Sequence, residues 1–250
     1  MFRRHRLALA VSAVACLLGA SAASADPVNT FTAAGSPSLV QPTTSSSYTI
    51  LLTNDSLSPA RAQRAKIGIP SGFTVDPLSV QATTTAVASS CDASIWEADG
   101  TLIADQKIHL KRPAGDSSSL CPGASLNVVF LAVSAATDGT YVWASELLDD
   151  LTSFTLSGSD PTVVVDGTAP DAAITQKPSD PSKESSPSFS FTASETGSTF
   201  ACKLDTGAFA DCTSPTSYAD LADGSHTFTV KATDAAGNTG LETTYSWTID

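Results

Sequence analysis

Apolar and polar residues alternate over several short stretches in the second half of the chain. The alternation runs through residues 189–191, 200–204, 226–232 and 245–249, where Phe, Val, Trp and Ile alternate mainly with Ser, Thr and Lys. A period of two places successive side chains on opposite faces of a strand, so these stretches predict strands with one buried face. Turn sequences separate them: Asp205-Thr206-Gly207, Ala222-Asp223-Gly224 and Gly237-Asn238.

The first half of the chain is also predicted to be β, although its pattern is less regular. Two of its segments are ambiguous: residues 83–90 are expected to form a loop or an edge strand, and residues 146–151 one helical turn or a loop. Short strands separated by turns favour antiparallel sandwiches, so the expected fold class is all-β. Strands are expected at 48–52, 65–70, 107–110, 126–133, 141–145, 154–156 and 162–165.

A domain boundary is predicted near residue 168. Residues 163–166 form the end of a strand and are followed by Gly167-Thr168-Ala169-Pro170-Asp171, a short stiff connector in which proline fixes φ and removes a ladder donor. The chain ends in the same way, with a strand that closes on Asp250. We therefore expect two tandem β-sandwiches, a first module of residues 26–167 and a second module of residues 168–250.

Residues 1–25 have the plan of a cleaved secretory signal peptide. Arg3, Arg4 and Arg6 precede an apolar run over 7–18, and Ala23-Ser24-Ala25 provides the small residues of a cleavage site after Ala25. The alternatives are a membrane anchor, for which the run is short, and a lipid on Cys16, which would divide the apolar run. No later stretch is long and apolar enough to span a membrane, so we expect a secreted or cell-surface protein.

Removal of the signal peptide leaves a strongly acidic chain. Ten Lys and Arg residues then face 25 Asp and Glu residues. Nucleic acids and anionic membranes are recognised by clustered positive charge, so this overall balance argues against both partners.

Four cysteines remain after cleavage: Cys91, Cys121, Cys202 and Cys212. An even number in an exported chain predicts disulfides, and four cysteines allow three pairings. Proximity in sequence and the domain boundary favour Cys91–Cys121 and Cys202–Cys212. A catalytic thiol would need a free cysteine in a basic setting, which this acidic chain does not offer.

The second module resembles a known family over residues 170–250. The resemblance is carried by 169–174, 189–191, 198–205, 209–218 and 221–238, which include Phe200-Ala201-Cys202-Lys203-Leu204-Asp205 and Asp234-Ala235-Ala236-Gly237-Asn238. These motifs are similar to the bacterial Ig-like repeats found in tandem in exported proteins, especially of actinobacterial type. The resemblance implies an Ig-like sandwich with its cysteine pair bonded, a spacer, adhesion or presentation role, and no catalytic residues.

Residues 28–167 are more distantly similar to another exported bacterial Ig-like class. In that class a strand ending in Thr-Asn leads to a strand that ends at a Pro-x-Gly turn, and here those pieces are 48–54 and 67–73. The insert that carries Cys91, Trp96 and Cys121 departs from this pattern, so the resemblance predicts no topology for that part.

The most plausible ligand-binding residues of the first module are Trp96, Glu97 and Asp99. An exposed tryptophan beside polar side chains is typical of a carbohydrate platform, with cell-wall glycan or another extracellular protein as the partner. The alternative, which we favour, is a core tryptophan that packs on the disulfide, as in Ig-like domains. Trp143 and Trp247 lie in alternating strands and are predicted to be core residues.

Catalysis is not expected, although a small hydrolase is a third hypothesis. The mature chain has two histidines: His226 is predicted to be an inward-facing or rim residue, and His109 to face solvent if its neighbours are buried. Neither a nucleophile elbow nor a zinc-binding histidine pair is present in the sequence. Carboxylates near the tryptophans of the first module are the remaining candidates for glycoside hydrolysis: Glu97, Asp99, Glu146, Asp149 and Asp150.

No cofactor is expected, and calcium is the one metal considered. Asp166, Asp171 and either Asp223 or Asp234 are candidates to meet near the module junction, because calcium prefers several oxygen ligands. The alternative, which we favour, is that Asp234 hydrogen-bonds within its own turn while Gly237-Asn238 supplies a positive φ.

Overall fold

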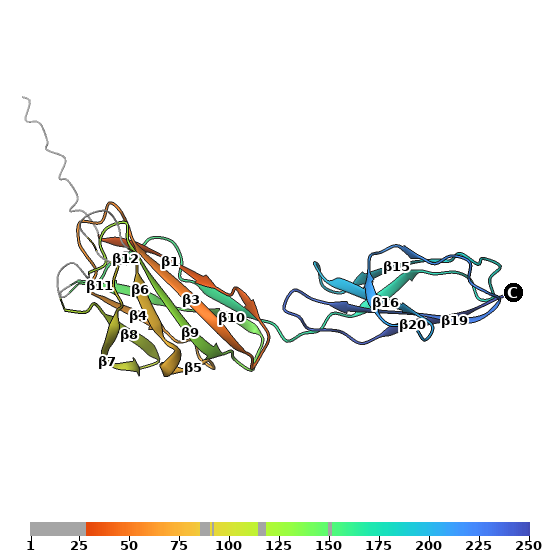
Figure 1. Ribbon diagram of the computed structural model, residues 1–250, viewed down its shortest axis with the longest axis horizontal. Coiled ribbons are helices and arrows are strands. Elements are labelled where there is room, and N and C mark those ends of the chain that lie inside the picture. The colour runs from red at the N-terminus through yellow and green to blue at the C-terminus, as the bar shows by residue number, and fades with distance from the viewer. Residues whose placement is uncertain (1–28, 86–90, 92, 115–118, 150–151) are drawn as a thin grey trace, which may run out of the picture.

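The computed structural model describes residues 29–85, 91, 93–114, 119–149 and 152–250. These residues form two β-sheet bodies that lie end to end (Figure 1), and the fold is all-β as predicted. A single 3-10 turn, η1 (Pro77–Ser79), is the only helical element among them. No helix in the described ranges is long and apolar enough to cross a membrane. The expected signal peptide lies outside the described residues.

The first module contains three sheets around one buried core. The largest has the order β12-β1-β3-β9-β5, with β6 also paired to β9, and the other two are β10-β13-β2 and β11-β4-β8-β7. The strands are β1 (Thr30–Ser36), β2 (Leu39–Val40), β3 (Ser45–Asn54), β4 (Arg64–Gly68), β5 (Thr74–Val75), β6 (Gln81–Thr84), β7 (Glu97–Ala104), β8 (Lys107–Lys111), β9 (Ser125–Val133), β10 (Gly139–Val142), β11 (Ser145–Leu148), β12 (Thr155–Leu156) and β13 (Thr162–Val165).

The long central pair β3 and β9 follows the alternation of the sequence. Tyr48 and Ile50 on β3 and Val128 and Phe130 on β9 are each 1% exposed or less, and the residues between them are less buried. The aromatic rings meet around Trp143, whose ring centroid lies 5.2 Å from that of Phe130 and 5.3 Å from that of Tyr48. Burying large rings in contact provides much of the stabilisation of such a core.

Two segments of the first module differ from the expected structure. Residues 141–145 do not form one strand: β10 pairs with β13 in one sheet, and β11 begins at Ser145 in another. Of residues 146–151, the first three belong to strand β11 rather than to a helical turn or loop, because buried Ser145 and Leu147 alternate with half-buried neighbours and the segment pairs with β4, while 150 and 151 lie outside the described residues. Of residues 83–90, the first two belong to β6, while 86–90 lie outside the described residues.

The second module is a two-sheet sandwich with a separate core. One sheet has the order β14-β15-β18 and the other β17-β16-β19-β20. Phe189, Phe228 and Trp247 are buried between them, with Phe189 and Phe228 stacked at 4.2 Å between ring centroids. The strands are β14 (Ala172–Gln176), β15 (Ser188–Ala193), β16 (Thr199–Leu204), β17 (Ala210–Cys212), β18 (Thr216–Ser217), β19 (Gly224–Thr233) and β20 (Thr243–Ile249).

The connector between the modules is anchored at both ends. On the first-module side, the carboxylate of Asp138 accepts hydrogen bonds from the Gly167 N–H and the Thr168 hydroxyl, each at 2.8 Å. On the second-module side, the Asp171 N–H donates to the Ser194 hydroxyl at 2.9 Å. These hydrogen bonds fix both ends of the connector, so we expect them to limit the motion of one module relative to the other.

Candidate functional site

Trp96, the candidate sugar platform, lies in the core of the first module. Its side chain is 4% exposed, and its backbone N–H donates to the Ala82 carbonyl at 2.8 Å, which holds it beside β6. A platform needs an exposed ring face, so the burial of Trp96 favours the core tryptophan, the interpretation preferred from the sequence, over the sugar platform. Trp143 and Trp247 are each 1% exposed, so none of the three tryptophans of the chain offers its ring to a ligand.

The two acids that follow Trp96 lie on the outward side of β7. Glu97 is exposed, and the Asp99 carboxylate forms an ion pair with the Arg64 guanidinium at 3.1 Å. Glu97 lines a shallow hollow together with Arg64, Lys111 and Arg112. Both acids therefore lie beside basic side chains.

Two further acids of the hydrolase hypothesis are committed to other contacts. Glu146 forms an ion pair with Lys107, and Asp149 accepts hydrogen bonds from the backbone N–H and the hydroxyl of Thr152 at 2.6 and 3.0 Å. Asp150 lies outside the described residues. Asp99, Glu146 and Asp149 thus each have a cationic or hydrogen-bond partner.

The structure contains both disulfides that proximity in sequence predicted. Cys91 is bonded to Cys121 in the core of the first module. Cys202 on β16 is bonded to Cys212 on β17, and the two strands are paired next to it. None of these four cysteines therefore has a free thiol that could act as a nucleophile. Each disulfide is expected to stabilise the module that contains it.

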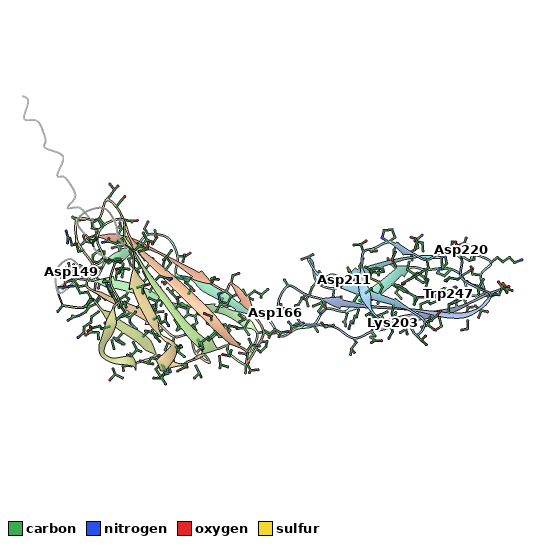
Figure 2. All side chains as sticks on the ribbon, in the orientation of Figure 1. Asp149, Asp166, Lys203, Asp211, Asp220 and Trp247 are labelled. Carbon is green, nitrogen blue, oxygen red and sulfur yellow. A yellow bond between two sulfur atoms is a disulfide. The ribbon has the colours of Figure 1, made fainter. Side chains whose placement is uncertain are left out.

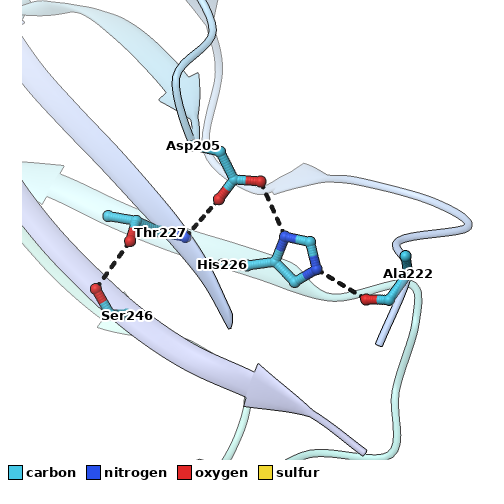
Figure 3. Close-up of polar contacts among 5 residues, drawn as sticks. All are labelled: Asp205, Ala222, His226, Thr227 and Ser246. Carbon is cyan, nitrogen blue, oxygen red and sulfur yellow. Dashed lines mark hydrogen bonds and ion pairs between the residues drawn. The ribbon is translucent and has the colours of Figure 1, made fainter. Parts of the chain in front are cut away.

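The two histidines among the described residues make local hydrogen bonds. His109 projects outward from β8, since Ile108 and Leu110 are buried, as predicted. His226 lies at the rim of the second module, where its Nδ1 is 2.9 Å from an Asp205 carboxylate oxygen and its Nε2 is 2.9 Å from the Ala222 carbonyl oxygen (Figure 3). In a catalytic triad the second nitrogen would face a nucleophile. Here a backbone carbonyl occupies that place.

The His226–Asp205 pair is expected to make the stability of the second module depend on pH. The hydrogen bond to the Ala222 carbonyl and then that to Asp205 raise the pKa of His226 above its ordinary value of 6.5. For Asp205, burial opposes ionisation, but the hydrogen bonds from His226 and the Thr227 N–H lower its pKa below 3.8. The pair therefore makes its full contribution to the stability of the second module between pH 3.8 and pH 6.5, the ordinary pKa values of the two groups. Its contribution decreases as pH rises through the raised histidine pKa or falls through the lowered aspartate pKa.

This dependence is measured by thermal unfolding of the chain from pH 5 to pH 9. We expect the second module to lose at most about 1 kcal/mol over this range, because solvent screens a partly exposed pair. The variant His226→Gln should flatten the curve. An unchanged slope in that variant would show that other groups cause the pH dependence.

Three carboxylates meet where the two modules join. Single ligand oxygens of Asp166, Glu195 and Asp234 all lie within 4.8 Å of one another. Asp166 stands at this junction in Figure 2. Burial, followed by the charges of Asp166 and Asp234, raises the pKa of the Glu195 carboxyl above its ordinary value. At neutral pH the cluster therefore concentrates negative charge at the junction.

Asp171 and Asp223, the other two candidates for calcium, do not belong to this cluster. Asp223 precedes β19 and Asp234 follows it, and a ten-residue strand separates them by roughly 30 Å. Asp171 is next to buried Ala172, so the pleat directs its side chain to the opposite face. Glu195 takes part instead, because the β14–β15 pairing brings the end of β15 to the junction.

The cluster alone does not identify a metal centre. Calcium takes six to eight oxygen ligands, and part of this set is already engaged. Asp234 accepts from the Asn238 backbone N–H at 2.8 Å and from the Asn238 amide at 2.9 Å, while Gly237 adopts φ 95°. This is the turn that the alternative interpretation of Asp234 predicted.

Asn238 also joins the two modules directly. Its side-chain amide donates to the Asp166 carbonyl at 2.8 Å, and its side-chain oxygen accepts from the Gln41 amide at 2.9 Å. Gln41 and Asp166 belong to the first module and Asn238 to the second. The end of one sandwich is therefore bonded to the end of the other through a single turn.

Comparison with known proteins identifies the second module. Residues 160–250 match the family model of the bacterial Ig-like domain. The second module is a bacterial Ig-like domain. The match begins at residue 160, between β12 and β13 of the first module and before the predicted boundary, and the Ig-like module with its connector accounts for most of it. No curated protein matches the chain.

Several solved structures are similar to this chain at low sequence identity. The fibronectin(III)-like modules of Clostridium thermocellum CbhA are 11% identical with a TM-score of 0.32, over 90% of this chain and 92% of theirs. A ScaB cohesin from Pseudobacteroides cellulosolvens is 10% identical with a TM-score of 0.32, over 56% of this chain and 94% of its own. The Yersinia pseudotuberculosis adhesin InvE is 11% identical with a TM-score of 0.28, over 87% of this chain and 58% of its own.

Proposed function

We propose that the chain is an extracellular, non-catalytic presentation module. The Ig-like module acts as a spacer, and the first module carries the contact with the partner. The observation that carries this proposal is the end-to-end junction, where the turn at Asn238 is bonded to Gln41 and Asp166. A junction held in this way sets the distance and direction between two bodies, which is what a spacer supplies.

Two further features support an extracellular location. Disulfides persist in oxidising compartments, and each module contains one. The first 25 residues have the plan of a signal peptide, as the sequence predicts. The acidic composition gives the surface a net charge that keeps exported proteins soluble.

Fractionation of producing bacteria tests the location. We expect the protein in the medium or accessible on the cell surface, with a mature N-terminus at Asp26 and no free thiol by mass spectrometry. A protein retained in the cytoplasm with reduced cysteines would contradict the proposal. Treatment of intact cells with protease separates surface display from retention inside.

Replacing Asn238 by alanine is expected to loosen the two modules without unfolding either. The change removes the side-chain bonds that link the modules, each of which contributes about 1 kcal/mol. In ¹⁵N relaxation, the modules of the unaltered chain should tumble with one correlation time, and those of the variant with two shorter ones.

The matched control is Asn127→Ala on β9, which removes a half-buried asparagine far from the junction and should leave the tumbling unchanged. If both modules of the Asn238 variant still tumbled with the single correlation time of the unaltered chain, the connector alone would hold the modules together. The proposed role of this turn would then be wrong.

A further inference from the structure

Four of the six Lys and Arg residues of the first module lie on one sheet, and the other two lie next to it in the sequence. Arg64 and Lys66 lie on β4, Lys107 and Lys111 lie on β8, and Arg61 and Arg112 flank these strands. The chain as a whole carries 25 acids against 13 bases, so this distribution is the reverse of its overall charge. We call the outward side of β4 and β8, with Arg112 at its end, the basic face.

The pleat and the strand register order these side chains into two rows. Ala65, Ile67, Ile108 and Leu110 are each 2% exposed or less, so the residues between them point outward. Arg64 is paired with Lys111 and Lys66 with His109, and Lys107 continues the second row. Alternate residues along a strand are about 7 Å apart and neighbouring strands about 5 Å apart, so the charges form a regular array.

Acids offset this charge only in part. Asp99 pairs with Arg64 and Glu146 pairs with Lys107, and all four side chains are 30–44% exposed. Solvent screens such pairs, so they remain open to competition by a ligand. Glu97 is the third acid and shares the hollow with Gln63 and three bases. Within the described residues, the four bases of β4 and β8 thus lie beside these three acids, and Lys66 is in neither ion pair and does not line the hollow.

The Ig-like module does not cover the basic face. Strands β4, β7, β8 and β11 lie on the side of the first body that points away from the second body (Figure 1). The outward residues of β4 and β8 are charged or polar apart from Gly68. A stable contact with a folded protein usually has an apolar centre, which these two strands lack.

We propose that the basic face binds a linear glycan that carries carboxylates, such as a polyuronate, and this inference rests on the extracellular role proposed above. Rows of cations at regular spacing match repeated negative charges along an extended polymer. Arginine recognises carboxylates through two parallel hydrogen bonds, and Glu97 offers an acceptor for sugar hydroxyls, while the Gln63 side-chain oxygen already accepts from Arg112 at 3.0 Å. The hydrated, polar character of the face favours such a polymer over an acidic protein.

Binding of residues 26–250 to immobilised polygalacturonate tests this inference. We expect binding that decreases at least tenfold between 50 and 200 mM NaCl and no binding to a neutral glycan, as for other polyanion complexes. Lys66→Glu and Lys111→Glu should each reduce affinity at least fivefold. Lys183→Glu, which makes the same charge change at an exposed site of the Ig-like module, should have little effect.

The other results would overturn the inference. Absence of binding, an equal loss in the Lys183 variant, or stronger binding to polyglutamate than to polygalacturonate would each contradict a glycan site. Circular dichroism of each variant verifies that the fold is retained, and Lys66→Gln and Lys111→Gln provide neutral replacements. Fractionation tests the proposed extracellular location, whereas this assay tests what the basic face binds. Failure of one proposal can therefore be distinguished from failure of the other.

Discussion

Replacing Trp143 by alanine is expected to destabilise the first module by about 3–5 kcal/mol, because it removes a buried aromatic side chain and leaves a cavity. Trp143 is 1% exposed, and its ring contacts those of Tyr48, Phe73 and Phe130 at 5.2–5.3 Å between centroids. The Ig-like module has its own core, which does not include Trp143. The loss should therefore be confined to one module.

Differential scanning calorimetry of the whole chain measures this effect. We expect the transition of the first module to move to a lower temperature while that of the Ig-like module stays in place. Trp247→Ala is the matched control, since Trp247 is equally buried in the other core and should move only the second transition. A common shift of both transitions in either variant would mean that the cores unfold as one unit.

Removing the Cys202–Cys212 disulfide is expected to cost the Ig-like module about 2–4 kcal/mol. The bond closes a loop between residues ten apart and joins the paired strands β16 and β17. Cys202 is 5% exposed, so its replacement also removes buried contacts. The double variant Cys202→Ala, Cys212→Ala keeps both side chains small and leaves no free thiol.

Urea unfolding followed by tryptophan fluorescence measures this loss, and Trp247 is the tryptophan that reports on the Ig-like module, whereas Trp96 and Trp143 report on the first module. The corresponding Cys91→Ala, Cys121→Ala variant is the control, because it should affect only the first module. If the Ig-like module kept its midpoint without its disulfide, the bond would be unnecessary for its stability and β16–β19 pairing would suffice.

Much of the fold follows from local pattern. The alternation at β3, β9, β15 and β19 is visible in the sequence because each strand buries one face, and burial decides which residues are apolar. The break between β10 and β11 is not visible, since Trp143 is buried between them and continues the apolar pattern. The break arises because β10 pairs with β13 and β11 pairs with β4, and these partner strands are distant from one another in the sequence.

The candidate site was less predictable than the fold. In the sequence, Trp96 is followed by polar residues, as in a sugar platform. In the structure, its backbone N–H is hydrogen-bonded to the Ala82 carbonyl beside β6, and its side chain is buried. Glu195 reaches the junction only through the β14–β15 pairing, so no local pattern marks it. The alternating bases of β4 and β8 are visible in the sequence, but only the register makes them neighbours.

Small-angle X-ray scattering of residues 26–250 in solution tests the central claim, that two sandwiches are held end to end as a spacer, most directly. The structure predicts a pair-distance distribution with a main peak from distances within each module and a distinct shoulder from distances between them, unchanged by dilution. A single symmetric peak from a compact particle, or a broad profile that needs many module orientations, would contradict the account.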